Sequence, residues 1–427
     1  MKTEQEKIKT GRIYLLIFVI CTLLLASSII FTPLDTILPN LLKIQTSSQR
    51  LFSDTFYVAG RGASVLNASL IGYFVLAMLL LANMKPDGFT VACVFLSMGF
   101  GFAGISLLSL LPIVFGTWIF AKIKSSRFKN YCNECILAFG LSPVINQIAF
   151  GYTPAFAKPG QIIMALAVAM LIGMSVPAIS KEIGKNQGKY KMQYELAGMG
   201  LITLIYYSGY KSVVIDRYNN NPLAIMNNIS SYNSNYWAIF IILFLLAILI
   251  AYLMNKNCFK EYIAQIKSNG GDDYISEFSF TSILINISTL GLLSLIYFAI
   301  VGMKLNGIAF CALFTVLAMA CIRLNPFHIP FAIIGVLISA YSCLHYLNDP
   351  IMIIGFSFSL GISAVYKNTS AIYVIIAGII FNYLNIFASE LFAGLNLYIA
   401  GTMMGISIFT VELLHKAFTY KEEKLNY

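Results

Sequence analysis

Continuous apolar runs of about twenty residues recur along the whole chain, and this feature limits the available folds more than any other. The clearest runs are residues 12–31, 160–180 and 236–254. A helix of that length crosses roughly 30 Å of hydrocarbon. Because the runs do not alternate with polar residues, they predict membrane helices and not the strands of a membrane barrel.

Composition and charge exclude a soluble protein. Of the 427 residues, 59% are hydrophobic and only 11% are charged, whereas soluble domains have about 25% charged residues. The net charge is +10, but the basic residues lie in short loops between apolar runs, as the positive-inside rule requires. Nucleic acid is therefore excluded as a partner, since no soluble module remains to bind it.

The sequence predicts an all-α polytopic membrane protein with about 14 membrane segments. The segments near 88–105, 134–152 and 350–366 are short or are broken by Gly and Pro, so each fits a half-helix or a re-entrant hairpin. The full set is 12–32, 61–83, 88–105, 108–123, 134–152, 160–180, 194–213, 236–254, 280–302, 306–322, 328–345, 350–366, 369–388 and 394–415.

Lysine and arginine are concentrated in alternate loops, which sets the orientation. The rich set contains the N-terminal segment, the loop from Lys122 to Lys129 and the C-terminal tail. We therefore predict a multi-pass protein of a bacterial cell membrane with both termini in the cytoplasm. The segments 33–60 and 216–235 would lie outside, and the first has the mixed apolar and polar pattern of an interfacial helix.

The chain contains an internal duplication. Matching residues keep one ungapped register over about fifty residues, which shared small residues in helix-packing faces do not explain. Further on the match needs gaps, where Tyr194 and Ala197 loosely correspond to Tyr398 and Gly401. The ungapped pairs, each separated by 219 (for example 286 − 67), are Asn67 and Asn286, Ser69 and Ser288, Gly72 and Gly291, Gly88 and Gly307, Phe95 and Phe314, and Gly116 and Gly335.

Seven predicted crossings separate the starts of the two repeats, and an odd number predicts that the halves are inverted across the membrane. Inverted repeats with interrupted helices are a common build of transporters. The predicted organisation is an N-terminal helix and outer loop (1–60), membrane repeat 1 (61–215), an outer loop with a linking helix and cytoplasmic loop (216–279), membrane repeat 2 (280–416) and a cytoplasmic tail (417–427).

Residues 305–316, followed by Pro330 and Gly335, resemble a family of uncharacterised bacterial integral membrane proteins, and so do residues 394–398 with Gly401 and Gly405. That family is a domain-of-unknown-function group built on an internal duplication, and the likeness covers most of the chain. Residues 318–325 depart from its Gly/Phe-rich turn, and it carries no established activity. The turns at Asn67 and Asn286 also look like those of urea channels, by analogy only.

Polar residues at membrane depth are the functional candidates, because hydrocarbon makes them costly. Prolines at 143, 326 and 330 free backbone groups that need polar partners. Amides beside them can satisfy that backbone or replace the water shell of a solute. A third group (Asn382, Asn385, Glu390 and Asn396) is weaker, with Glu390 read as an outer-loop residue. The candidates for a substrate path are Asn67, Ser142, Asn146, Gln147, Asn286, Asn325 and His328.

No motif indicates an enzyme, a cofactor or a metal. Cys132 and Cys135 form a lone pair without a second pair or a nearby His, so we expect no zinc site. Phosphate loops and nucleophile elbows do not occur in the sequence. The favoured function is a transporter or channel for a small polar or ionic solute. The alternatives are an intramembrane enzyme acting on lipid, which would use Arg323, His328 and Glu390, and a non-catalytic component of a membrane assembly. A homo-oligomer stays open.

Overall fold

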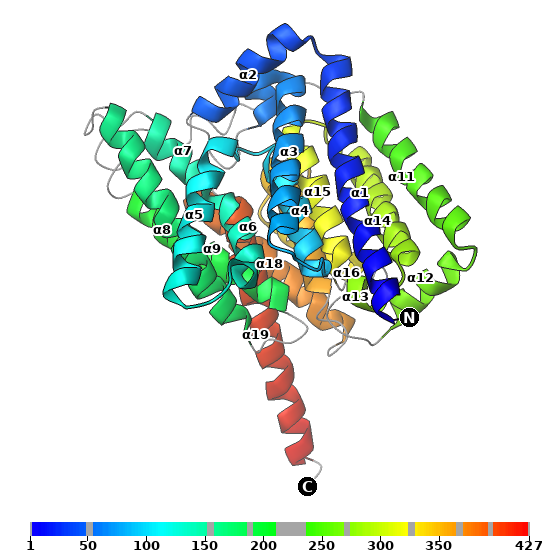
Figure 1. Cartoon of the computed structure of the whole chain (residues 1–427). Helices are drawn as coiled ribbons and strands as arrows, with labels where there is room; N and C mark the ends of the chain where they lie inside the picture. Colours follow the sequence, from blue (N-terminus) through cyan, green and yellow to red (C-terminus); the bar gives the residue numbers. More distant parts are fainter. Residues whose placement is uncertain are drawn as a thin grey trace.

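The computed structural model describes residues 2–47, 54–151, 158–185, 191–210, 236–268, 274–322, 329–363, 370–391 and 396–425, and all regular structure in these ranges is helical (Figure 1). The first half contains α1 (Lys2–Phe31), α2 (Leu34–Thr46), α3 (Thr55–Leu81), α4 (Gly88–Phe100), α5 (Leu107–Ile123), α6 (Cys132–Ala138), α7 (Ser142–Phe150), α8 (Lys158–Gly184) and α9 (Lys191–Tyr210), with 3-10 turns at Phe128–Tyr131 and Phe139–Leu141. The second half contains α11 (Tyr236–Met254), α12 (Cys258–Lys267), α13 (Tyr274–Glu277), α14 (Phe280–Ile300), α15 (Gly307–Cys321), α16 (Ile329–Ser342), α17 (Pro350–Ser359), α18 (Ala371–Leu391) and α19 (Asn396–Leu425).

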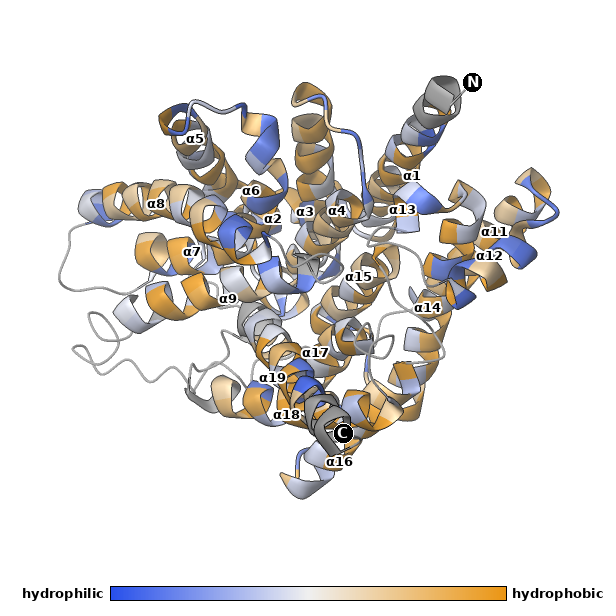
Figure 2. Cartoon of the chain, turned by 90° about the horizontal axis from the view of Figure 1, so that it is seen from below, coloured by the Kyte–Doolittle hydropathy of each residue, from blue (hydrophilic) through white to orange (hydrophobic). Residues whose placement is uncertain are grey.

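Long apolar helices confirm the multi-pass membrane architecture. Among the described residues, six helices are long and apolar enough to cross a membrane, or seven if α5 and the segment 128–150, bent by 116°, form one broken span. Their outer faces expose large apolar side chains such as Leu81 (85%) and Ile300 (78%), and Figure 2 shows hydrophobic residues spread over the peripheral helices. Such a surface suits lipid and not water. The total of about 14 segments stays a prediction.

The three segments predicted to be short or broken, near 88–105, 134–152 and 350–366, are short or divided in the structure. The first is α4, with 13 residues, and the third is α17, with 10 residues. The second is divided into α6 and α7 by the 3-10 turn at Phe139–Leu141. A crossing needs about 20 helical residues, so none of these helices spans hydrocarbon alone.

An amphipathic helix, α2, forms in the predicted outer segment. Ile37 and Ile44 are buried in it, whereas Leu38 and Leu42 are about 60% exposed. Figure 1 shows α2 at one end of the bundle and both chain termini at the other. The termini therefore lie at the same end, as the predicted topology requires.

Equivalent helix starts support the duplication in three dimensions. The side chain of Asp87 caps α4 by accepting a hydrogen bond from the backbone N–H of Thr90 at 2.7 Å, and Asn306 caps α15 through Ala309 N–H at 3.0 Å. Both separations, 306 − 87 and 309 − 90, equal 219. A capping side chain fixes where a helix begins. The caps at Asp87 and Asn306 therefore make α4 and α15 begin at equivalent positions of the two repeats.

Equivalent glycines also allow two helix pairs to cross in the same way. A Cβ on Gly116 of α5 would lie 2.1 Å from the carbonyl oxygen of Met170 in α8. A Cβ on Gly335 of α16 would lie 2.3 Å from that of Ile375 in α18. Both approaches need glycine, because any side chain would collide with backbone.

The partner helices contribute the reciprocal glycines. A Cβ on Gly173 would lie 2.1 Å from the Ile113 carbonyl oxygen, and one on Gly378 would lie 2.6 Å from that of Ala332. Ala332 follows Ile113 by 219 residues (332 − 113), but Gly378 follows Gly173 by only 205 (378 − 173). The second repeat is therefore 14 residues shorter (219 − 205) between these helices, which is why the sequence match needs gaps there.

Replacing Gly173 with Leu is expected to destabilise the protein by about 1–3 kcal/mol or more, because overpacking must separate α5 from α8. The measurement is the melting temperature of the purified protein in detergent. Gly11→Leu is the matched control, since no atom lies within 4 Å of a Cβ at that glycine. Equal melting temperatures for the two variants would show that the crossing is not tight.

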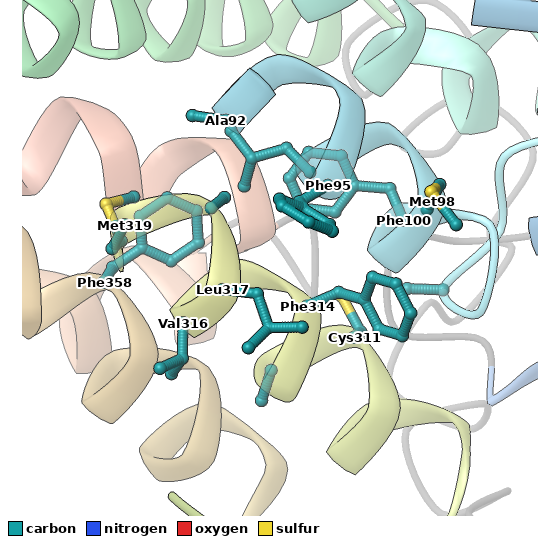
Figure 3. Packing of buried hydrophobic residues seen from close by; sticks show 14 of the residues in the cluster. Ala92, Phe95, Met98, Phe100, Cys311, Phe314, Val316, Leu317, Met319 and Phe358 are labelled. Atoms are coloured by element: carbon teal, nitrogen blue, oxygen red, sulfur yellow. The ribbon is translucent and has the colours of Figure 1, made fainter. Parts of the chain in front are cut away.

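The halves meet where α4 packs on α15. The rings of the equivalent residues Phe95 and Phe314 lie 6.3 Å apart between centroids, and Figure 3 shows both side chains in this contact. Gly99, near the C-terminal end of α4, approaches Cys311, in the N-terminal part of α15, with 3.1 Å from its Cβ position to the Cys311 carbonyl oxygen. The equivalent residues Phe95 and Phe314 therefore lie together where the two halves pack on each other.

A second contact between the halves joins α9 to α19. A Cβ on Gly401 would lie 3.0 Å from the carbonyl oxygen of Leu196, and the hydroxyl of Thr402 donates to the carbonyl oxygen of Ala197 at 3.0 Å. These residues adjoin the loosely matched pair Ala197 and Gly401. The last helices of the two repeats therefore pack on each other, as α4 and α15 do.

Candidate functional site

Two equivalent asparagines hold the inner ends of the short helices α4 and α15. Asn67 donates from Nδ2 to the carbonyl oxygens of Gly101 and Ile105, both at 2.9 Å. Asn286 donates from Nδ2 to that of Ala320 at 2.8 Å. The separations 286 − 67 and 320 − 101 are both 219. Because the last carbonyls of a helix lack partners within the helix, these amides satisfy them inside the protein.

In the first repeat the asparagine is part of a longer chain of hydrogen bonds. Gln45 of α2 donates from Nε2 to Asn67 Oδ1 at 2.9 Å, and its Oε1 accepts from Leu108 N–H at 3.4 Å. Both Gln45 and Asn67 are buried. The acceptor and both donors of the Asn67 amide are therefore engaged by protein groups.

Three serines and a second asparagine continue this network. Ser142 Oγ accepts from the backbone N–H of Ser106 at 3.0 Å and shares a hydrogen bond with Ser109 Oγ. Ser106 Oγ donates to Asn146 Oδ1 at 2.9 Å. Asn146 Nδ2 is buried and has no hydrogen-bond partner among the described residues. We name Gln45, Asn67, Ser106, Ser109, Ser142 and Asn146 the first polar cluster.

A smaller polar cluster lies between α16, α17 and α18 in the second half. Asn382 donates from Nδ2 to Ser339 Oγ at 2.8 Å, and Asn385 donates to the Ile351 carbonyl oxygen at 3.4 Å. The two amides approach α17 where Gly355 has no side chain, within 3.1 Å of its Cβ position. Asn382 Oδ1 has no partner within the part of the chain that the structure describes.

The predicted path residues are divided between the halves. Asn67, Ser142 and Asn146 belong to the first polar cluster, Gln147 is half-buried one residue further along α7, and Asn286 lies in the second half. Asn325 and His328 fall outside the described residues, as does Arg323, and the side chain of Glu390 is not described. The sequence did not predict that Gln45, Ser106 and Ser109 belong to this cluster. For Gln45, the signal was a polar residue on the apolar side of α2.

Aromatic side chains fill the space between the halves. The ring of Phe310 lies 5.0 Å from Phe102, 5.0 Å from Phe240 and 5.3 Å from Phe56 between centroids. Phe56 and Phe102 of the first half and Phe240 and Phe310 of the second half therefore form one aromatic contact between the halves. A cavity of about 390 Å³ lies beside α2, lined by Phe31, Thr32, Ile37, Asn40, Phe56, Ala59, Gly60, Arg61, Gly62 and Ala63.

A buried carboxylate joins the halves at the start of α15. Asp54 Oδ1 accepts from the backbone N–H of Phe56 at 2.9 Å and from that of Gly307 at 3.0 Å. Its side chain is fully buried, and a negative charge there is favoured by the positive end of the α15 dipole. A Cβ on Gly307 would lie 2.4 Å from Asp54 Oδ1, so this contact needs glycine.

The same residue types recur in the other repeat. Asp273 follows Asp54 by 219 residues, as Gly307 follows Gly88. Asp273 itself lies outside the described residues. Across the described ranges, no group of three or more His, Cys, Asp or Glu residues could hold a metal ion. Cys132 and Cys135 are buried free thiols.

Comparison with known proteins gives one family. A family model with the description "Protein of unknown function (DUF1576)" matches the chain twice, over residues 34–211 and 254–416, which together exceed half of its length. The starts are separated by 254 − 34 = 220 residues, close to the 219 of the repeated side chains. No curated protein and no solved structure matches.

Proposed function

Because this chain belongs to the DUF1576 family, an uncharacterised family with an internal duplication, we propose a function from its own geometry: a membrane transporter for a small polar or ionic solute. The observation that carries the proposal is the pair of short helices whose inner ends are held by Asn67 and Asn286. Helices that stop inside the membrane, in equivalent places of two repeats, are the usual frame of a transport site.

We propose further that the repeats are inverted across the membrane. Two observations support this arrangement. The short helices α2 and α12, each placed after the first long helix of its half, lie at opposite ends of the bundle in Figure 1. In the contact between α4 and α15, the C-terminal end of one helix meets the N-terminal part of the other. A two-fold axis in the membrane plane produces both.

A carrier fits this structure better than an open channel. The aromatic rings around Phe310 pack together between the halves, while the cavity near Arg61 lies at the α2 end. A solute would then bind at one end and be released at the other after the halves move against each other. The proposal includes no chemical change of the solute and no cofactor; its partners are the lipid bilayer and the solute, and a homo-oligomer is compatible with it.

Topology provides the first test. We expect both termini to be cytoplasmic, in a bacterial cell membrane, as the distribution of Lys and Arg implies. Reporter domains fused to either terminus should be active only in the cytoplasm, and a reporter inserted in residues 216–235 should be active only outside. Termini found on opposite sides would contradict both the topology and the same-end placement in Figure 1.

Solute flux in proteoliposomes tests the function itself. The purified chain would be screened with a panel of sugars, amino acids, carboxylates, urea, ammonium and inorganic anions. A transporter should give flux of at least one of them that saturates with solute concentration and is absent from protein-free liposomes. Folded protein that moves none of the panel would count against transport.

A further inference from the structure

The two repeats differ at one equivalent atom. In the first repeat, Asn67 Oδ1 is satisfied by the amide of Gln45. In the second, Asn286 Oδ1 is buried and has no hydrogen-bond partner among the described residues. The Asn286 side chain is fully buried, so bulk water does not satisfy this oxygen. A buried carbonyl oxygen without a partner costs free energy, so a ligand is to be expected there.

Within the described part of the second repeat, no protein donor takes the place of Gln45. The corresponding short helix, α12, also has a buried glutamine in its last turn, Gln265. Neither amide atom of Gln265 has a hydrogen-bond partner in the described ranges, so Gln265 does not donate to Asn286. The position filled by a protein N–H group beside Asn67 is thus left without a donor beside Asn286.

The surroundings of Asn286 Oδ1 favour a positive charge. Its own Nδ2 is bound to the carbonyl of Ala320, in the last turn of α15. The C-terminal end of a helix carries about half a negative charge from its unpaired carbonyls. Where helices end inside a membrane, such carbonyls and amide oxygens are typical ligands of a monovalent cation.

We infer that a small monovalent cation, of the class of Na⁺, binds at Asn286 Oδ1 beside the C-terminal end of α15. This inference rests on the proposed transport function, in which it supplies the coupling ion. The first repeat has no equivalent site, because the Gln45 amide occupies that position. One cation is therefore expected per chain.

The test measures binding of radioactive Na⁺ to the purified full-length chain in detergent, with choline replacing Na⁺ in the reference buffer. We expect saturable binding of one ion per chain and a higher melting temperature in Na⁺ than in choline. Competition by K⁺ or ammonium would support the site and rank the cations. Absence of both saturable binding and stabilisation would overturn it.

Matched variants locate the ion. Asn286→Ala should weaken Na⁺ binding by at least about tenfold, whereas Asn286→Asp, which keeps an acceptor oxygen and adds charge, should retain it. Ser288→Ala is the matched control on the same helix and should change the affinity less than about twofold, since its hydroxyl donates within α14 to the carbonyl oxygen of Leu284. If Asn286→Ala does not fold, loss of binding in Asn286→Asp overturns the site.

Failure of the site and failure of transport can be told apart. Binding is measured without any solute, so a bound cation with no flux would remove the transporter and keep the site. Flux that is equal in Na⁺ and choline, together with no Na⁺ binding, would keep the transporter and remove the site.

Discussion

Replacing Asp54 with Ala is expected to lower the free energy of unfolding by about 2–6 kcal/mol. The carboxylate accepts hydrogen bonds from the backbone N–H groups of Phe56 and Gly307 in a fully buried position. Leaving a buried donor without a partner costs about 1–3 kcal/mol, and two are affected. The contact also ties the start of α15 to the first half, so its loss should weaken the packing between the halves.

Thermal unfolding with a thiol-reactive dye measures this effect, because seven of the eight cysteines are buried and become reactive only on unfolding. Asp54→Asn keeps the acceptor oxygen and should lose less stability than Asp54→Ala. Asp35→Ala is the matched control, since Asp35 lies exposed in the first turn of α2. A melting temperature unchanged in Asp54→Ala would show that the buried carboxylate does not hold the halves together.

The membrane class and the duplication could be read from the sequence, because hydropathy and residue spacing are local properties. The constant separation of 219 predicted that Asn67 and Asn286 occupy equivalent places, and both bind carbonyls at the end of a short helix. The short length of α4 was indicated by Gly99 and Gly101, which end the apolar run early.

The partners of the polar residues could not be predicted, because they come from segments distant in the chain. Gln45 reaches Asn67 across 22 residues, and Asp54 reaches Gly307 across 253. Nothing in the pattern around Asp54 distinguishes an outer-loop carboxylate from one that caps a helix in the other half. Gln45 donates to Asn67, whereas Gln265 does not donate to Asn286. This difference depends on side-chain geometry, since both residues are glutamines.

Replacing Asn146 with Leu is expected to reduce solute flux by at least about tenfold, while leaving the yield of folded protein near normal. The side chain of Asn146 accepts a hydrogen bond from Ser106 Oγ, and its Nδ2 has no partner in the described structure. Losing one buried hydrogen bond lowers the free energy of unfolding by about 0.5–1.5 kcal/mol. Removing a buried donor that has no partner offsets part of this loss, because that donor itself destabilises the folded protein. Asn146 therefore contributes little to folding, and its Nδ2 can donate a hydrogen bond to a solute.

Asn67→Leu is the matched comparison, because it removes hydrogen bonds to Gln45, Gly101 and Ile105 at once. We expect that variant to lose folded protein, so that flux cannot be measured. Flux would be assayed in proteoliposomes and divided by the amount of folded chain recovered from gel filtration. If Asn146→Leu instead lowers the folded yield and leaves flux per folded molecule unchanged, Asn146 serves only to join α7 to the Ser106 turn, and the first polar cluster is a structural joint and not part of the solute path.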